Sequence, residues 1–442
     1  MKEMKIPEKG ISGEVLLEEL KTAKGGDVCW ENGRMFSLIY NAGKEIIDLG
    51  VEAYSSFLVE NGLSPFAFKS LKKLETEVAA MCCGMMNGGR DAVGSMTCGG
   101  TESIFMAVKT ARDHAVVERK ITSGLNIVIP LTAHPAFDKA AHYLGLEVRH
   151  VPVNENFRAE PAAMASATDA GTILMAGSAM TYPHGVVDPI KELAAVAAEK
   201  NIWFHVDSCL GGFVLPFAKK LGYPIPDFDF NVPGVISMSA DIHKYGFAPK
   251  GASIVMYRSA KYRRFQYFAY ADWPGGVYGT STFAGARTGG AIAGAWTVMR
   301  HLGEDGYMKL VDRTMKTTKK LMDGVRSIDG LKVMGTPDAT VFAIGSDTLN
   351  VYALSDELGE RGWLLEKQHQ PPCLHLTVSP FHSEIADEFL AVLAEATDRI
   401  RGKDASKISQ EAAMYGMMAT MPDRNLARDL AVQYLNDLYR LE

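Results

Sequence analysis

Several features are missing from this sequence of 442 residues, and each absence argues against a class of protein. It contains no run of five or more basic residues and its formal net charge is −6, which argues against nucleic acid as a partner. No uninterrupted apolar stretch is long enough to span a membrane, since the most apolar long window, 282–300, contains Arg287 and several glycines. The first ten residues hold no apolar signal core, so we expect a cytoplasmic protein.

Cysteine is also scarce. The six cysteines form no CxxC pair, and no histidine stands at the spacing of a zinc site. We therefore expect reduced thiols and no metal centre. The chain has no internal repeats and no low-complexity segment.

The composition that remains, 47% hydrophobic and 22% charged residues, is typical of a globular protein large enough for two domains. From about residue 90, short β-type runs alternate with helical runs, which is typical of a mostly parallel sheet covered by helices on both faces. The predicted strands of this sheet are 126–130, 146–152, 172–178, 202–207, 234–240 and 252–258.

Three parts follow from this pattern: a helical N-terminal arm (1–60), a large α/β domain (61–300) and a smaller α+β domain (301–442). The smaller domain is expected to hold strands at 341–346 and 373–380 and to be helical again from 406. The main predicted helices are 44–60, 69–86, 102–118, 190–200, 301–328 and 383–400.

A lysine with a chemical role is indicated in SADIHKYGFAPKG (239–251), where Lys244 follows the predicted strand 234–240. The end of a strand in an α/β sheet is where ligand groups are usually presented, and a desolvated lysine there can act as a nucleophile. Taken alone, Lys244 could equally be a solvated surface lysine.

Three other clusters occur at similar places. TCGGTESIFMAVK (97–109) sets glycines, including Gly100, before a helix start, which suits a phosphate but is also an ordinary loop-to-helix turn with Thr101 as a cap. Asp207 ends the apolar run FHVD. Its carboxylate could pair with a pyridine nitrogen, cap a helix or bind a metal. His134, after strand 126–130, could stack on a flat ring or cap a helix.

Together these clusters match the needs of one cofactor, pyridoxal 5′-phosphate. A phosphate cup, a ring-facing histidine, an aspartate and a lysine follow one another, each near the end of an apolar run. This order indicates that Lys244 holds the cofactor, with His243 beside it.

The chain resembles the fold-type I pyridoxal-phosphate enzymes (aspartate aminotransferase-like fold), their decarboxylase-like branch and, within it, the sphingosine 1-phosphate lyases of soluble bacterial type. The resemblance covers residues 30–442 and is carried by TCGGTESI, YPHGVVDPIKEL (182–193), HVDSCLGGF, SADIHKYGFAPKG, DWPGGVYGTSTFAGARTGG (272–290) and AAMYGMMATMPDRNLARDL (412–430).

The resemblance implies the role of each site residue. Lys244, Asp207, His134 and Tyr182 would be catalytic, with Lys244 on the cofactor, Asp207 on its ring nitrogen, His134 on its ring face and Tyr182 near the reacting carbons. The cofactor's phosphate would be held by Gly100, Thr101, His243 and, from the second subunit of a homodimer, Gly279, Thr280 and Ser281. The substrate would be bound by Tyr40, Asn61, Ser64 and Lys250.

One position departs from the family pattern. The lyases read NPLHP where this chain reads NGLSP (61–65), so Ser64 stands where a phosphate-binding histidine is expected. The implied activity is a retro-aldol cleavage of a phosphorylated sphingoid base, a small amino-alcohol lipid, to a long-chain aldehyde and phosphoethanolamine. Its base, Tyr182 or Lys244, must be neutral, and we expect burial beside a cation to lower the pKa of Lys244. An amino-acid decarboxylase on the same fold and a cofactor-binding homologue without turnover are the alternatives.

Overall fold

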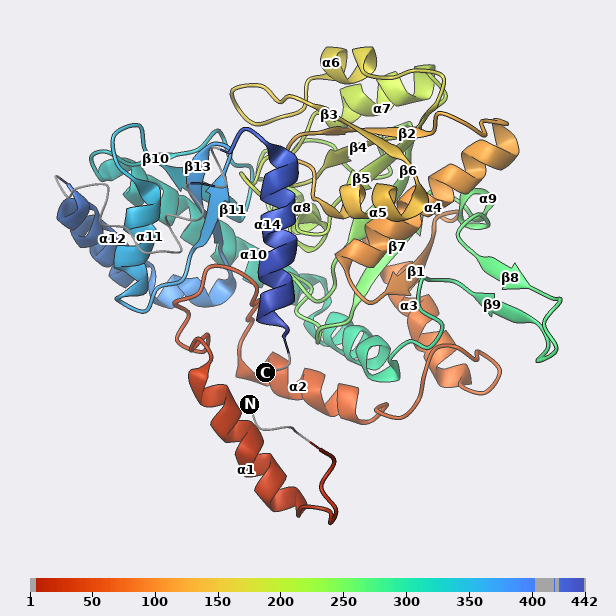
Figure 1. The fold of residues 1–442 in the computed structure, drawn as a ribbon, viewed down its shortest axis with the longest axis horizontal. Helices are drawn as coiled ribbons and strands as arrows, with labels where there is room; N and C mark the ends of the chain where they lie inside the picture. The colour runs from red at the N-terminus through yellow and green to blue at the C-terminus, as the bar shows by residue number, and fades with distance from the viewer. Residues whose placement is uncertain (1–4, 402–416, 418–420, 441–442) are drawn as a thin grey trace.

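A seven-stranded sheet forms the centre of the larger part of the molecule, in a computed structural model that describes residues 5–401, 417 and 421–440 (Figure 1). The strand order is β1-β7-β6-β5-β4-β2-β3; β3, β2, β4, β5 and β6 run parallel, and β7 and β1 are antiparallel to their neighbours. The strands are β1 (Val93–Thr97), β2 (Asn126–Pro130), β3 (Glu147–Val151), β4 (Thr172–Ser178), β5 (Trp203–Asp207), β6 (Val235–Ala240) and β7 (Ser253–Tyr257). The predicted mostly parallel sheet is confirmed.

Helices cover both faces of this sheet, because its strands bury side chains in both directions. In β2, Ile127 and Ile129 pack in one apolar cluster, with residues of α4 and α5, whereas Val128 between them packs in a second cluster on the other face. The covering helices are α3 (Lys69–Met85), α4 (Gly100–Glu118), α5 (Ala136–Leu144), α6 (Pro161–Ser166), α7 (Ile190–Glu199) and α8 (Leu215–Lys220).

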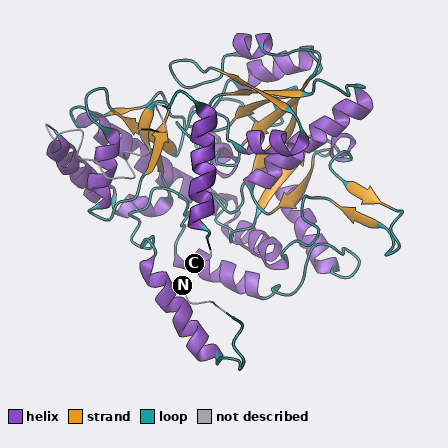
Figure 2. Ribbon diagram, viewed as in Figure 1, coloured by secondary structure: helices purple, strands orange, loops and turns teal. Residues whose placement is uncertain are grey.

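A smaller antiparallel sheet lies apart from the first, in the order β10-β11-β13-β12 (Figure 2). It packs with two helices around a core that includes Phe36, Trp363 and Phe389. Its elements are β10 (Lys332–Val333), β11 (Val341–Gly345), α11 (Val351–Gly359), β12 (Glu366–His369), β13 (Pro372–Thr377) and α12 (Ala386–Ile400). This is the smaller C-terminal α+β unit that the sequence predicts, although the division of the chain at 60 and 300 stays a prediction.

One long helical segment, α10 (Gly289–Ser327), connects the two sheets and is interrupted at Gly303. The part after Gly303 matches the predicted helix 301–328. The part before it was not predicted, because three glycines that argue against a helix are used for packing. A side chain on Gly290 would lie 2.7 Å from the main-chain oxygen of Tyr54, and one on Gly294 would lie 2.8 Å from the Pro249 ring. The glycines therefore allow α10 to approach α2 (Lys44–Ser55) closely, and the helix continues through them.

The strands predicted for the large sheet match to within one residue at each end, whereas other elements differ from the prediction. The predicted helix 44–60 ends at Ser55, and residues 61–63 turn towards Arg287. Among the elements that were not predicted are β1, the polar strand β12, and a hairpin of β8 (Phe268–Tyr270) and β9 (Tyr278–Thr280) that projects from the body.

The two ends of the chain add helices to the surface. Helix α1 (Gly13–Ala23) buries none of its residues and extends away from the body (Figure 1). Helix α14 (Arg424–Leu438) confirms helix in part of the region after 406; residues 402–416 lie outside the described residues. Among the helices of the described ranges, none is both long and apolar enough to cross a bilayer.

The contact between α10 and α2 gives a test of the fold. Gly290→Ala is expected to lower the free energy of unfolding by about 1–3 kcal/mol, because the new methyl group overpacks against Tyr54. Gly84→Ala in α3 is the matched control, since nothing lies within 4 Å of its added carbon. The control is expected to gain up to about 1 kcal/mol from helix propensity. Denaturant unfolding of both variants measures the difference, and equal effects would contradict the close packing.

Candidate active site

The site is built where β4, β5 and β6 end, side by side and in parallel. Ser178 of β4 is level with Asp207 of β5, and Asp207 is level with Ser239 of β6. The Asp207 carboxylate is buried, and its Oδ1 accepts hydrogen bonds from the Cys209 amide at 3.0 Å and from the Ser239 hydroxyl at 3.2 Å. These bonds hold a carboxylate at the carboxyl edge of the sheet, where ligands of open α/β sheets bind.

Lys244 lies in the turn that follows β6, and its Nζ is 2.9 Å from Oδ2 of Asp241. Asp241 is only 2% exposed, and its Oδ1 accepts a hydrogen bond from the Ser253 hydroxyl at 2.5 Å. Burial lowers the pKa of Lys244, but the negative charge of Asp241 and smaller effects of Tyr40 and Cys209 outweigh burial and raise it. The expectation that a cationic neighbour lowers this pKa is therefore wrong, because the nearest charge is an anion.

His134 lies close to these groups. Burial lowers the pKa of its ring, while the charges of Asp207 and Asp241 oppose that effect and the charge of Lys244 adds to it. Its Nδ1 accepts a hydrogen bond from the Ala136 amide at 3.1 Å, so the proton of the neutral ring is on Nε2. The ring is thus fixed by the start of α5, in the surroundings of Lys244 and Asp207.

The start of α4 faces the same groups. A side-chain carbon on Gly100 would lie 2.8 Å from both Oδ2 of Asp241 and Sγ of Cys209, so only glycine fits there. One carbon of the His243 ring would lie 3.6 Å from a carbon added to Gly99. Thr101 is exposed in the first turn of the helix. Free amide groups and the helix dipole make this terminus suitable for a phosphate.

His243 lies beside that terminus. Its Nδ1 accepts a hydrogen bond from the Ala252 amide at 3.2 Å, which leaves the proton of the neutral ring on Nε2, 3.8 Å from Oδ2 of Asp241. Burial lowers the pKa of this ring. His243 can therefore donate to a phosphate at the start of α4.

Tyr40 and Lys250 line a cavity of about 300 Å³ together with His243. Burial raises the pKa of Tyr40 to about 12, so its phenol stays protonated and can donate a hydrogen bond to an anion. The Lys250 Nζ is 2.9 Å from the Leu38 carbonyl oxygen and 5.3 Å from the centre of the Tyr40 ring. A phenol and an amine therefore stand together at the Lys244 loop, a combination that can bind an anion.

Tyr182 lies in the turn after β4. Its ring stacks on that of His375 in β13, with centroids 4.1 Å apart and 20° between the planes. The turn is held to the site by the Ala179 amide, which donates to the main-chain oxygen of Asp207 at 2.8 Å. The structure thus places Tyr182 between the large sheet and the smaller one.

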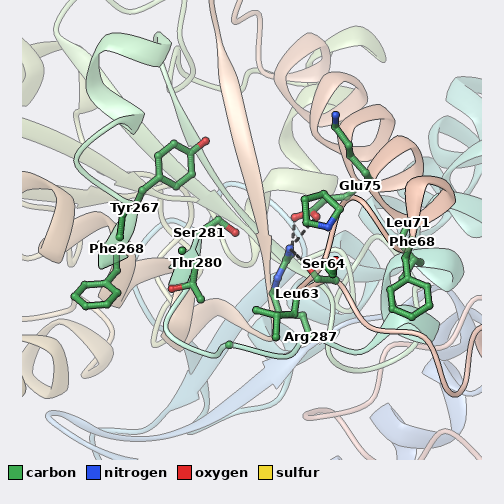
Figure 3. A pocket seen from close by; sticks show the side chains of 16 residues that line it. Leu63, Ser64, Phe68, Leu71, Glu75, Tyr267, Phe268, Thr280, Ser281 and Arg287 are labelled. Atoms are coloured by element: carbon green, nitrogen blue, oxygen red, sulfur yellow. Dashed lines mark hydrogen bonds and ion pairs between the residues drawn. The ribbon is translucent and has the colours of Figure 1, made fainter. Parts of the chain in front are cut away.

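The remaining predicted residues line a different cavity of about 460 Å³, which contains Ser64, Gly279, Thr280 and Ser281 (Figure 3). The Ser64 hydroxyl accepts a hydrogen bond from the Ala67 amide at 3.3 Å. Asn61 lies at the edge of this region and forms a β-bridge with Thr288. On one chain, these residues are therefore separate from the cavity of Tyr40 and Lys250.

An ion pair holds the Asn61 loop in place. Arg287 pairs with both oxygens of Glu75 and donates to the main-chain oxygen of Gly62 at 3.2 Å, as Figure 3 shows for the two side chains. Glu102, in the first turn of α4, accepts from the amide of Phe283 at 3.0 Å, so the segment after Ser281 is tied to the α4 terminus.

Several of these residues were not predicted. Asp241 has a local signal, because it lies three residues before Lys244 in the same motif, but it was not singled out. Arg287, Glu102 and His375 have no such signal, since each acts on residues that are distant in sequence. Residues 412–416 and 418–420 of the motif at 412–430 lie outside the described residues.

Comparisons with known proteins agree with this geometry. The model of the family described as "Pyridoxal-dependent decarboxylase conserved domain" matches residues 2–341. The sphingosine-1-phosphate lyase of Oryza sativa subsp. japonica is 43% identical over 98% of this chain and 81% of its own length. This chain belongs to the sphingosine-1-phosphate lyase family.

Two further relatives support this placement. Sphingosine-1-phosphate lyase 1 of Rattus norvegicus is 40% identical over 98% of this chain and 77% of its own length. The solved structure of the Burkholderia pseudomallei K96243 sphingosine-1-phosphate lyase Bpss2021 superposes with a TM-score of 0.91, at 36% identity, over 99% of this chain and 98% of that one. The family's cofactor is pyridoxal 5′-phosphate.

The residues present fit this cofactor. The start of α4, which no side chain caps, offers amide groups for a phosphate, the buried Asp207 offers a carboxylate for a ring nitrogen, and Lys244 offers an amine for the aldehyde carbon. Asp207 and Lys244 are held at one edge of the sheet by adjacent strands, β5 and β6.

The covalent role of Lys244 can be tested by spectroscopy. Lys244→Ala, incubated with pyridoxal phosphate and then desalted, is expected to lose the visible absorbance of the bound cofactor, because its amine is the covalent attachment point. Lys250→Ala is the matched control from the same loop and should keep this absorbance. Persistence of the full visible band in Lys244→Ala would contradict the assignment.

Proposed function

We propose that this chain is a pyridoxal-phosphate-dependent lyase that cleaves a carbon–carbon bond of a phosphorylated sphingoid base, releasing a long-chain aldehyde and phosphoethanolamine. The observation that carries the proposal is the pair Tyr40 and Lys250, which supplies a second anion site next to Lys244 and beyond the cofactor's own phosphate site. A substrate that carries an amine and a phosphate needs both.

The positions of the residues support a role for each. Asp207 would keep the ring nitrogen of the cofactor protonated, and His134 would stack on the ring. Gly100, Thr101 and His243 would bind the cofactor's phosphate at the start of α4, while Tyr40 and Lys250 would bind the substrate's phosphate. When bound, pyridoxal phosphate supplies the electron sink for the bond that breaks.

A base must remove the proton from the substrate hydroxyl before that bond breaks, and Tyr182 and Lys244 are the two candidates. Lys244 is paired with Asp241, which favours its protonated form. Tyr182 belongs to the turn beside Asp207. These positions support both groups as candidates for proton transfer.

A homodimer with shared sites is part of the proposal. Ser64, Asn61 and Gly279–Ser281 line or border one cavity, whereas Tyr40, Lys250 and His243 line another on the same chain. If the residues of both cavities bind the same substrate and cofactor, Ser64, Asn61 and Gly279–Ser281 must come from a second copy of the chain. The exposed apolar side chains of α1, among them Leu17 at 62% and Leu20 at 63%, offer a surface that such a copy would cover.

An amino-acid decarboxylase would use the same cofactor but would need a positive group for the substrate carboxylate. Among the described residues that line the Tyr40 cavity there is no arginine, and Arg287, which lines the Ser64 cavity, is already paired with Glu75. Release of carbon dioxide from free amino acids, at rates that match cleavage of a phosphorylated sphingoid base, would overturn the lyase proposal.

Recognition of the substrate phosphate generates a kinetic prediction. Turnover of a sphingoid base is expected to fall sharply when its phosphate is removed, and Lys250→Ala should abolish that preference. Ser64→His should lower KM for the phosphorylated substrate about tenfold, because a charge-assisted hydrogen bond contributes roughly 1.5–3 kcal/mol and replaces a weaker neutral one.

The comparison uses wild type and both variants, each with the phosphorylated and the dephosphorylated base, and follows aldehyde release. The dephosphorylated base is the internal control, since Ser64→His should leave its turnover unchanged. Equal turnover of both bases by the wild type would show that Tyr40 and Lys250 do not read a phosphate.

A further inference from the structure

One strand of the smaller sheet sends two side chains towards the proposed active site. His375 and Thr377 are separated by one residue in β13, and side chains two positions apart lie on the same face of a strand. Both are buried, at 0% and 2% exposure. Each contacts one of the two tyrosines to which the proposed function gives a role.

His375 contacts Tyr182. The two rings are nearly parallel with centroids 4.1 Å apart, so the face of the His375 ring packs against the face of the Tyr182 ring. Burial lowers the pKa of His375 to about 3, so its ring is neutral over the range in which enzymes usually work. It therefore acts on Tyr182 as a neutral ring, through its shape and position, and not as a cation or a general acid.

Thr377 contacts Tyr40. Its hydroxyl forms a hydrogen bond with the Tyr40 phenol and lies 2.7 Å from Nε2 of His375. Thr377 thus connects the tyrosine of the phosphate pair with the histidine behind Tyr182. Tyr40 and Tyr182 are far apart in sequence, but each contacts one of two side chains on the same face of β13.

The strand itself is firmly held. It pairs with β11 on one side and β12 on the other. The Thr377 amide donates to the Phe36 carbonyl oxygen at 2.7 Å, and the hydroxyl of Tyr245, the residue after Lys244, donates to the Val378 carbonyl oxygen at 2.7 Å. The segment that leads to Tyr40 and the loop of Lys244 are therefore both tied to the end of β13.

We propose that His375 and Thr377 are positioning residues of the lyase reaction: His375 orients Tyr182 for the chemical step, and Thr377 orients Tyr40 for phosphate binding. The inference rests on the proposed function. In this proposal, the smaller sheet sets the distance between Tyr40, which would bind the phosphate, and Tyr182, which would lie at the reacting carbons. The two residues have different consequences, because one supports catalysis and the other supports binding.

The first test separates kcat from KM. His375→Leu keeps the volume apolar but removes the ring stack, so kcat is expected to fall about ten- to a hundredfold with KM within twofold, because a misplaced catalytic group slows the chemical step. His375→Phe restores a flat ring and should recover most of kcat. His382→Leu is the matched control, since His382 is likewise buried and stacks on Phe36 with centroids 4.2 Å apart. It should lower thermal stability but leave kcat within twofold.

The second test concerns Thr377. Thr377→Val removes only the hydroxyl and should raise KM for the phosphorylated base about two- to tenfold, the effect of one hydrogen bond, without changing KM for the dephosphorylated base. Thr377→Ser keeps the hydroxyl and should restore the wild-type KM. The visible absorbance of bound cofactor should be unchanged in all variants, which shows that the Lys244 site is intact.

The outcomes distinguish the inference from the function on which it rests. If the wild type does not cleave the phosphorylated base, the proposed function fails. If the wild type is active and His375→Leu keeps its kcat, or His375→Phe is as impaired as His375→Leu, the positioning role of His375 is overturned. Equal effects of Thr377→Val on both bases would overturn the role of Thr377.

Discussion

The structure depends on the common register of β4, β5 and β6. Because these strands are parallel and level, Ser178, Asp207 and Ser239 meet at one edge, and the loop after β6 returns Lys244 to that edge next to Asp241. The groups proposed for the ring nitrogen and the carbonyl carbon of the cofactor are thus fixed by the pairing of these strands, whereas those proposed for its phosphate include the start of α4, which follows β1. A shift of β5 by one residue would turn the Asp207 side chain to the opposite face.

The sequence was sufficient for the features that depend on neighbouring residues. Apolar runs specify the buried strands, and motifs such as HVD and SADIHKYG place Asp207 and Lys244 at their ends. It was insufficient where distant segments decide the outcome. Gly290 and Gly294 argue against a helix until the contact with Tyr54 and Pro249 is known, and β12 has no apolar pattern of its own.

In the candidate active site too, local features could be predicted from the sequence and contacts between distant segments could not. The nearest charge to Lys244 was read with the wrong sign, because a carboxylate three residues away is brought into contact by a turn and buried with it. His375 could not be found at all, since its contact with Tyr182 joins positions almost two hundred residues apart. Local patterns therefore identify the groups that perform chemistry, and tertiary packing identifies those that hold them in place.

Helix α10 has a geometric consequence for this arrangement. It is continuous in direction except at Gly303, whose φ of 56° and ψ of −175° are not helical and divide it into two rods. The first rod packs on α2, where Gly290 meets Tyr54. The second rod begins in the core of the larger sheet, where Tyr307 and Val311 are buried, and its far end packs on α12, where Gly324 meets Leu390. With a rise of about 1.5 Å per residue, the second rod is about 36 Å long. Because this one rod is packed at both ends, it fixes the position of the smaller sheet relative to the larger one, and with it the gap between the two halves of the site.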